Sequence, residues 1–94
     1  MEIFSDKKFE KFFKAVAELK NAEDCRKFFE DVCTIKEIED MTQRLEVAFL
    51  LSSGSNYQEV VKSTGASTAT ISRVNKCLNY GAGGYKLVLN KDGK

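Results

Sequence analysis

The chain has 94 residues and a formal net charge of +1, with 43% hydrophobic residues, three cysteines and no histidine. A chain of this length forms one domain, or one protomer of an intertwined oligomer, and buries only about two thirds of the surface that its unfolded form exposes. The absence of histidine and the cysteine spacing argue against zinc, haem and histidine-dependent catalytic sites. The sequence also has no Gly-rich phosphate loop and no nucleophile beside a base, so no enzyme is expected.

The N-terminal third is predicted to form two amphipathic helices. Ser5 is expected to cap the first helix, in which apolar residues recur at three and four positions: Phe9, Phe12, Phe13, Val16 and Leu19. Asn21 is expected to cap the second helix, whose apolar residues are Cys25, Phe28, Phe29 and Val32.

All seven phenylalanines precede residue 50. Short helices that bury large aromatic rings gain most by interleaving with a partner, so this pattern favours a core shared between two copies of the chain. The alternative is a self-contained bundle with the rings inside.

Thr34 and Glu37 form a capping box that starts the longest predicted helix, and Gly54 ends it. Its apolar face is expected to contain Ile35, Ile38, Met41, Leu45, Ala48 and Leu51. We therefore assign residues 1–54 to dimerisation helices within a single domain that covers residues 1–94.

Residues 55–80 have the pattern of a DNA-binding helix-turn-helix. Asn56 and Glu59 form a second capping box, and Gly65 allows the positive φ that a tight turn between crossing helices needs. Ser67 or Thr68 is expected to cap the second helix. The side chains expected to be buried are Val60, Val61, Thr64, Ala66, Ile71, Val74 and Leu78. The alternative is an ordinary helical hairpin within a core.

The second helix of this pair begins with small or polar residues, which let its backbone approach base edges closely. We expect Thr68, Ala69 and Ser72 to face base edges, and the lysines and the arginine to face phosphates. The predicted DNA-binding set consists of Lys62, Ser67, Thr68, Ala69, Ser72, Arg73 and Lys76.

The charge distribution agrees with this assignment. Residues 1–54 hold 9 Lys/Arg against 12 Asp/Glu, whereas residues 55–94 hold 6 against 2. The basic excess lies with the predicted reading head, where phosphate contacts need it. Because the excess is modest, a dimer would be needed to double the number of contacts.

Residues 81–94 form a C-terminal segment in which Gly81, Gly83 and Gly84 make a flexible break before residues 85–89, a short helix or an extended arm. The three cysteines lie among apolar helical positions, which suggests buried, reduced thiols. No apolar run approaches the length of a membrane span, and the N-terminus lacks the order of a signal peptide, so we expect a cytoplasmic protein.

Three segments together are specific: residues 40–48, residues 64–78 with their Thr-Ala-Thr-Ile-Ser-Arg sequence, and residues 79–85 with Asn-Tyr-Gly and Gly-Gly-Tyr. Over nearly the whole chain they closely resemble the YerC/YecD group of the Trp repressor superfamily. The resemblance implies an all-α fold of about six helices, paired as an intertwined homodimer. Its recognition helices would point at successive major grooves, with half-sites about one helical turn apart.

The Trp repressor holds tryptophan between two arginines, near a threonine and a glycine of the reading helix. The resemblance places Arg44, Thr70 and Arg73 at the arginine and threonine positions, as a possible ligand site. Val74 replaces the glycine and should fill much of the space for an indole, so tryptophan is not the expected ligand. Both arginines are instead expected to pair with Glu46 or with phosphate, and a smaller or flatter effector is the open alternative.

The sequence therefore predicts a homodimeric, sequence-specific DNA-binding regulator, a repressor in its simplest form, whose partners are double-stranded DNA and a second copy of itself. No cofactor, metal or membrane is expected. The modest positive charge and the few arginines favour an alternative, a helical protein–protein interaction module that retains the fold without specific DNA binding.

Overall fold

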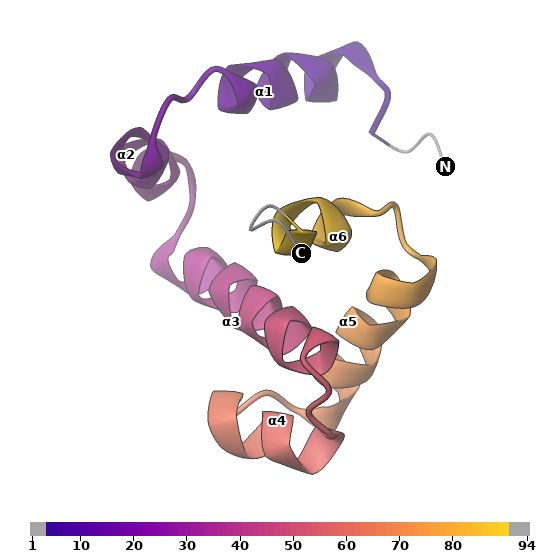
Figure 1. Cartoon of the computed structure of the whole chain (residues 1–94). Coiled ribbons are helices and arrows are strands. Elements are labelled where there is room, and N and C mark those ends of the chain that lie inside the picture. Colours follow the sequence, from indigo (N-terminus) through magenta and orange to yellow (C-terminus); the bar gives the residue numbers. More distant parts are fainter. Residues whose placement is uncertain (1–3, 91–94) are drawn as a thin grey trace. The chain divides into compact units, whose positions relative to one another are not determined.

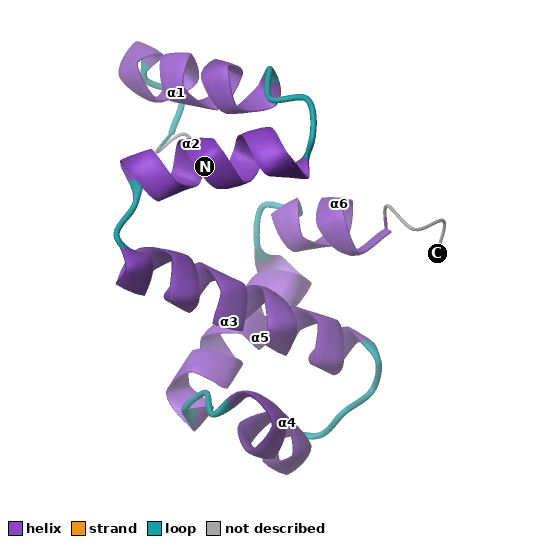
Figure 2. Cartoon of the chain, turned by 90° about the vertical axis from the view of Figure 1, so that its left-hand side faces the viewer, coloured by secondary structure: helices purple, strands orange, loops and turns teal. Residues whose placement is uncertain are grey.

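The computed structural model describes residues 4–90, whose regular structure is entirely helical (Figures 1 and 2). The predicted all-α fold of about six helices is confirmed. Residues 91–94 of the predicted C-terminal segment lie outside the described residues. The chain divides into two compact units, Met1–Ile38 and Glu39–Lys94. The helices are α1 (Lys7–Ala17), α2 (Ala22–Val32), α3 (Ile35–Ser52), α4 (Tyr57–Thr64), α5 (Thr68–Tyr80) and α6 (Gly84–Leu89).

In the N-terminal unit, aromatic rings connect α1 and α2. The ring of Phe12 lies 6.1 Å from that of Phe28, and Phe4 packs edge-on against Phe9 at 5.3 Å. Neither helix contains a buried residue, and Phe13 is 49% exposed. Within this unit, α1 and α2 therefore leave the aromatic rings at least partly exposed.

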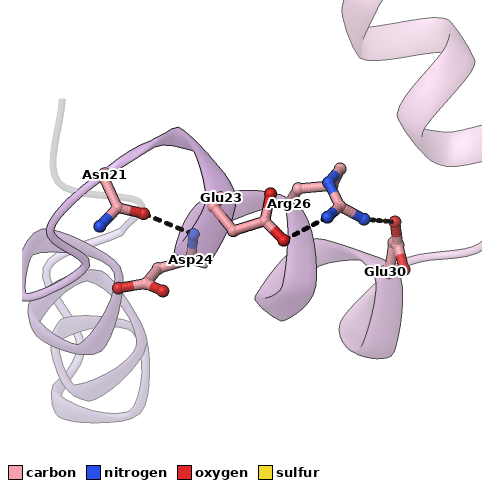
Figure 3. A network of polar contacts seen from close by, with 5 residues as sticks. All are labelled: Asn21, Glu23, Asp24, Arg26 and Glu30. Carbon is pink, nitrogen blue, oxygen red and sulfur yellow. Dashed lines mark hydrogen bonds and ion pairs between the residues drawn. The ribbon is translucent and has the colours of Figure 1, made fainter.

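The polar side of α2 is organised around Arg26 (Figure 3). Its guanidinium group donates to the carboxylates of Glu23 and Glu30, in the second case at 2.8 Å. The hydrogen bonds to Glu23 and then Glu30 raise the pKa of Arg26 above its ordinary value. Asn21 caps the helix as predicted, since its Oδ1 accepts from the Asp24 N–H at 2.9 Å.

Short-range capping was predicted correctly for α3 and wrongly for α1. The Thr34 N–H donates to Glu37 Oε1 at 2.8 Å, and the Glu37 N–H donates to Thr34 Oγ1 at 3.0 Å. The N-cap of α1 is Asp6 rather than Ser5, because the Asp6 carboxylate accepts from the Lys8 N–H at 3.1 Å. A carboxylate at this position also interacts favourably with the positive end of the helix dipole.

Helices α3 to α6 build the core. All buried residues within the described range belong to this C-terminal unit: Val47, Ala48, Val60, Ala66, Ile71 and Val74. Each fully buried branched side chain contributes about 1.5–3 kcal/mol. Partly buried side chains surround this cluster, namely Leu50, Leu51, Leu78, Tyr85 and Leu89.

Helix α4 begins and ends as its sequence predicts. The predicted capping box is present, with the Asn56 N–H donating to Glu59 Oε1 at 2.8 Å and the Glu59 N–H donating to Asn56 Oδ1 at 2.9 Å. Gly65 ends the helix at φ 75°, and its N–H donates to the Val61 carbonyl at 2.9 Å. This left-handed residue turns the chain from α4 into α5.

The hydroxyl group of Thr64 bridges the two sides of this turn. It donates to the Val60 carbonyl at 2.7 Å and accepts from the Ala66 N–H at 3.1 Å. From α3, the Gln43 side-chain amide donates to the Thr64 carbonyl at 3.2 Å. The turn is thus stabilised by its own hydrogen bonds and by a contact with Gln43, which precedes Thr64 by 21 residues.

The predicted burial of Val61 is wrong, because its side chain is 37% exposed. The inner side of α4 is instead formed by Val60, which is buried, and by Thr64, which is half-buried four residues later. Val61 lies about 100° around the helix from Val60. A helix of eight residues buries only a narrow stripe.

The prediction that the cysteines are buried is also wrong. All three are free, but Cys25 and Cys33 are half-buried and Cys77 is exposed. Cys33 lies at the C-cap of α2, outside the helix proper. Cys77 lies three residues after the buried Val74, on the flank of α5 rather than on its inner face.

The predicted break after α5 is present, and of the two alternatives for residues 85–89 the structure shows the helix. Gly81 ends α5, and Gly83 precedes α6 at φ 91°. Tyr85 and Leu89, four residues apart on α6, pack against the core. This packing explains why so short a helix forms.

Replacing Gly65 with alanine is expected to lower the free energy of unfolding by about 1–2 kcal/mol, because a left-handed backbone is unfavourable for a residue with a Cβ atom. Apart from Gly65 itself and its two chain neighbours, no heavy atom lies within 4 Å of the position that this Cβ would take, so the cost is conformational rather than steric. Urea denaturation at a fixed protein concentration measures it.

Gly84→Ala is the matched control. Gly84 lies in the first turn of α6, has no positive φ, and has open space at its Cβ position. Its replacement should leave stability unchanged or slightly raised. If the Gly65 variant unfolds at the same urea concentration as the parent protein, the turn does not need a left-handed residue.

Candidate nucleic-acid interface

Helix α5 has an inner and an outer side. Ile71 and Val74 are buried and Leu78 is half-buried, which defines the inner side. At 3.6 residues per turn, Ala69, Arg73 and Lys76 lie on the opposite side of the helix and point away from the core. The structure leaves the whole predicted DNA-binding set exposed, with one member on α4, one at the N-cap of α5 and five on α5: Lys62, Ser67, Thr68, Ala69, Ser72, Arg73 and Lys76.

The first turn of α5 is fixed by Ser67. Its Oγ accepts from the Thr70 N–H at 3.1 Å and donates to Thr70 Oγ1 at 3.1 Å, which makes Ser67 the cap rather than Thr68. The Ser67 hydroxyl proton is therefore already used within the chain. By contrast, the hydroxyls of Thr68 and Ser72 have no hydrogen-bond partner within residues 4–90, so their donors and acceptors face solvent.

The charges on α4 and α5 are mainly positive. Lys62, Arg73 and Lys76 are exposed, and none of them forms an ion pair within the described part of the chain. The one carboxylate of these two helices belongs to Glu59 and accepts the Asn56 N–H in the capping box. This surface therefore presents cations to solvent without nearby neutralisation by its own helices.

The residues of the possible ligand site do not form a connected group. Arg44 on α3 and Thr70 on α5 are half-buried, whereas Arg73 is exposed. No hydrogen bond or ion pair joins these side chains within residues 4–90, and Thr70 bonds Ser67 instead. The expected ion pair between Arg44 and Glu46 is also not formed, because residues two apart on a helix point in different directions.

Val74 is 1% exposed and belongs to the core cluster that contains Val47, Val60 and Ile71. Its side chain thus occupies packed space on the inner side of α5. A β-branched residue at this position therefore fills space that a glycine would leave open.

Two hollows flank α5 in the C-terminal unit. One, of about 620 Å³, has walls from the end of α3, from α5 and from α6, including Ser52, Asn75 and Lys86. The other, of about 420 Å³, has walls from α3, α5 and α6, including Leu45, Cys77 and Tyr85. Neither hollow is lined by the residues of the possible ligand site.

Sequence reasoning missed the contribution of Gln43 to this surface. Gln43 lies on α3, and its contact with the Thr64 carbonyl holds the turn before α5. The bond spans 21 positions in sequence, so no local pattern signals it. Thr64 was expected to be buried because of its spacing, and no role was predicted for its hydroxyl group, which closes the turn.

Within residues 4–90, no helix combines the length and the apolar character needed to cross a membrane. Over the same range, no group of three or more His, Cys, Asp or Glu side chains is placed to hold a metal ion.

Known proteins resemble this chain over most of its length. The uncharacterized protein YerC of Bacillus subtilis strain 168 is 48% identical over 85 residues, which cover 90% of this chain and 82% of that protein. A crystal structure from Staphylococcus aureus, provisionally identified as a Trp repressor, superposes with a TM-score of 0.91 at 38% identity, covering 99% of this chain and 95% of that one. A TrpR-like protein from Eubacterium eligens gives 0.92 at 45% identity, covering 99% and 96%.

The predicted similarity to the YerC group and to the Trp repressor fold is confirmed by these comparisons. Residues 7–92 match the Trp repressor protein family, and the chain belongs to that family.

Proposed function

We propose that the protein is a cytoplasmic, sequence-specific DNA-binding regulator that acts as a homodimer, in its simplest form as a repressor. The outer side of α5 is the observation that carries this proposal. It combines free hydroxyls on Thr68 and Ser72, a small side chain at Ala69 and cations at Arg73 and Lys76 that have no ion pair within residues 4–90. Small residues allow close approach, hydroxyls donate and accept at base edges, and cations bind phosphates.

In the proposed complex, the N-terminal end of α5 enters the major groove. Thr68, Ala69 and Ser72 contact base edges, while Arg73 and Lys76 contact phosphates, with Lys62 of α4 as a further cation. Ser67 supports the interface through its cap, since its proton is donated to Thr70. With so few cations in one copy, useful affinity at cellular salt needs two copies on one DNA site.

Exposed apolar side chains in the N-terminal half support the homodimer. Phe12 is 39% exposed, Phe13 49%, Val32 52% and Ile35 78%. A small domain that leaves so much apolar surface in water gains stability when a second copy covers it. A two-fold arrangement would also place two copies of α5 on successive major grooves.

Tryptophan is not the effector in this proposal. Val74 occupies the core next to α5, and Thr70 already bonds Ser67. Arg73 is exposed on the DNA side of α5 and is better used on phosphate.

A second function is favoured by one observation on α4. Tyr57 is 36% exposed and Val61 37%, and these two apolar side chains lie four residues apart on the same face. Such a pair suits contact with another protein. An interaction module of this kind would capture its partner independently of salt and would not bind DNA above background.

Replacing Arg73 with alanine is expected to weaken binding to every duplex. Each phosphate contact contributes about 0.9 to the slope of log affinity against log salt concentration, so loss of one contact per copy should flatten the slope of a dimer by about 2. Thr68→Ala should instead alter sequence preference, because a base contact contributes about 1–3 kcal/mol to the discrimination between the right and the wrong base. Fluorescence anisotropy with a selected duplex and a scrambled one, over a salt series, separates the two effects.

Lys27→Ala is the charge-matched control, because it removes an exposed cation from α2 and should leave DNA affinity within about twofold. Added L-tryptophan should leave the parent protein's affinity unchanged. Absence of any preference for the selected duplex would refute the proposal. A protein partner that remains bound after nuclease treatment of the lysate would then favour the interaction module.

Phe13→Glu is expected to dissociate the dimer. Phe13 is about half exposed in its own chain, so the change costs the isolated chain little, whereas a carboxylate in an apolar interface should weaken self-association by about 30-fold or more. Sedimentation velocity over a concentration series measures this. Lys11→Gln changes the charge by the same amount on the same helix and should leave the dimer intact. A parent protein that sediments as a monomer at micromolar concentration would contradict the shared core.

A further inference from the structure

The outer side of α5 continues beyond the residues that the proposed function uses. Ala69, Arg73, Lys76 and Tyr80 follow one another at intervals of four, three and four positions. This spacing aligns their side chains on one stripe of the helix. Tyr80, at the C-terminal end of α5, therefore shares a face with the two cations assigned to phosphate.

Tyr80 has no partner in its own chain. It is 84% exposed, the largest exposure among the large hydrophobic side chains of the described range. Within residues 4–90 its phenol group forms no hydrogen bond and its ring no aromatic contact. Tyr85, five residues later, packs instead against the core. The ring of Tyr80 thus contributes little to the packing of the described part of the chain.

The backbone at Gly81 makes Tyr80 the last residue of α5. The Gly81 N–H donates to the Cys77 carbonyl at 2.9 Å, which completes the last turn of α5. A Cβ atom at Gly81 would overlap that same carbonyl oxygen. Glycine therefore lets the chain leave the helix directly after Tyr80, while Tyr80 itself stays helical and outward.

The length of α5 sets the distance between Tyr80 and the residues that are assigned to base edges. At 1.5 Å per residue, Tyr80 lies about 16 Å along the helix from Ala69 and about 6 Å beyond Lys76. The major groove is about 8.5 Å deep. When the first turn of α5 reaches base edges, the backbone of Tyr80 is therefore outside the groove. Because a helical side chain is tilted toward the N-terminus of its helix, the tyrosine side chain points back toward the phosphates along the groove edge.

We propose that Tyr80 is a phosphate-contacting residue of the DNA interface, with its phenol O–H donating to a backbone oxygen at the edge of the groove that α5 enters. The assignment rests on the proposed function. A neutral hydroxyl bound to an anionic oxygen forms a charge-assisted hydrogen bond. It stabilises the complex without releasing a counterion and without reading a base.

The decisive variant is Tyr80→Phe, which removes only the hydroxyl group. It should weaken binding by about 100-fold or more on selected and scrambled duplexes alike, because a hydrogen bond to a charged group is lost in each of the two copies. The slope of log affinity against log salt should stay that of the parent protein, unlike the slope of the Arg73→Ala variant. Anisotropy titrations over a salt series measure both quantities.

Tyr85→Phe is the matched control, since it removes the same group from a half-buried tyrosine on α6 and should leave affinity within about twofold. Thermal unfolding should show both variants folded like the parent protein, and sedimentation should show equal dimerisation. A parent protein that binds no duplex refutes the proposed function itself. If the parent protein binds DNA and the Tyr80→Phe and Tyr85→Phe variants bind it with equal affinity, the Tyr80 contact alone is refuted. Dissociation of the dimer of the Tyr80→Phe variant would refute that contact as well.

Discussion

The left-handed backbone at Gly65 determines which side of α5 meets solvent. It turns the chain so that Ile71 and Val74 pack under α4, and the outer residues of α5 then have no core to join. Thr64 holds this turn from both sides through its hydroxyl group, and Gln43 ties it to α3. The candidate reading surface is thus a consequence of how one glycine and two polar side chains orient a pair of short helices.

The two units of the chain differ in what they bury. The C-terminal unit has a small aliphatic core, while α1 and α2 keep their phenylalanines at least partly exposed. A small core gives marginal stability, because conformational entropy opposes folding on a similar scale to apolar burial. Covering the aromatic side chains with a second copy would add apolar burial and would also double the cations available to DNA. Stability and affinity would then depend on the same association.

The sequence was informative where a structure depends on contacts three or four residues apart. Asn21 and the pair of Thr34 and Glu37 cap their helices as predicted, because capping bonds are local. The prediction that Ser5 caps α1 was wrong because the adjacent Asp6 is an equally good N-cap residue. Burial was harder to predict, since it depends on how an element sits against distant ones, and Val61 and Cys77 are exposed for that reason. The roles assigned to α5 stay predictions about a complex.

The most direct test of this account is selection of DNA sites from a random duplex library by the purified full-length protein, followed by sequencing. Two copies of α5 related by a two-fold axis should enrich a pseudo-palindrome whose half-sites have centres about 10 base pairs apart. Enrichment of no sequence, or of a single half-site without its inverted counterpart, would contradict the claim that paired α5 helices read adjacent major grooves.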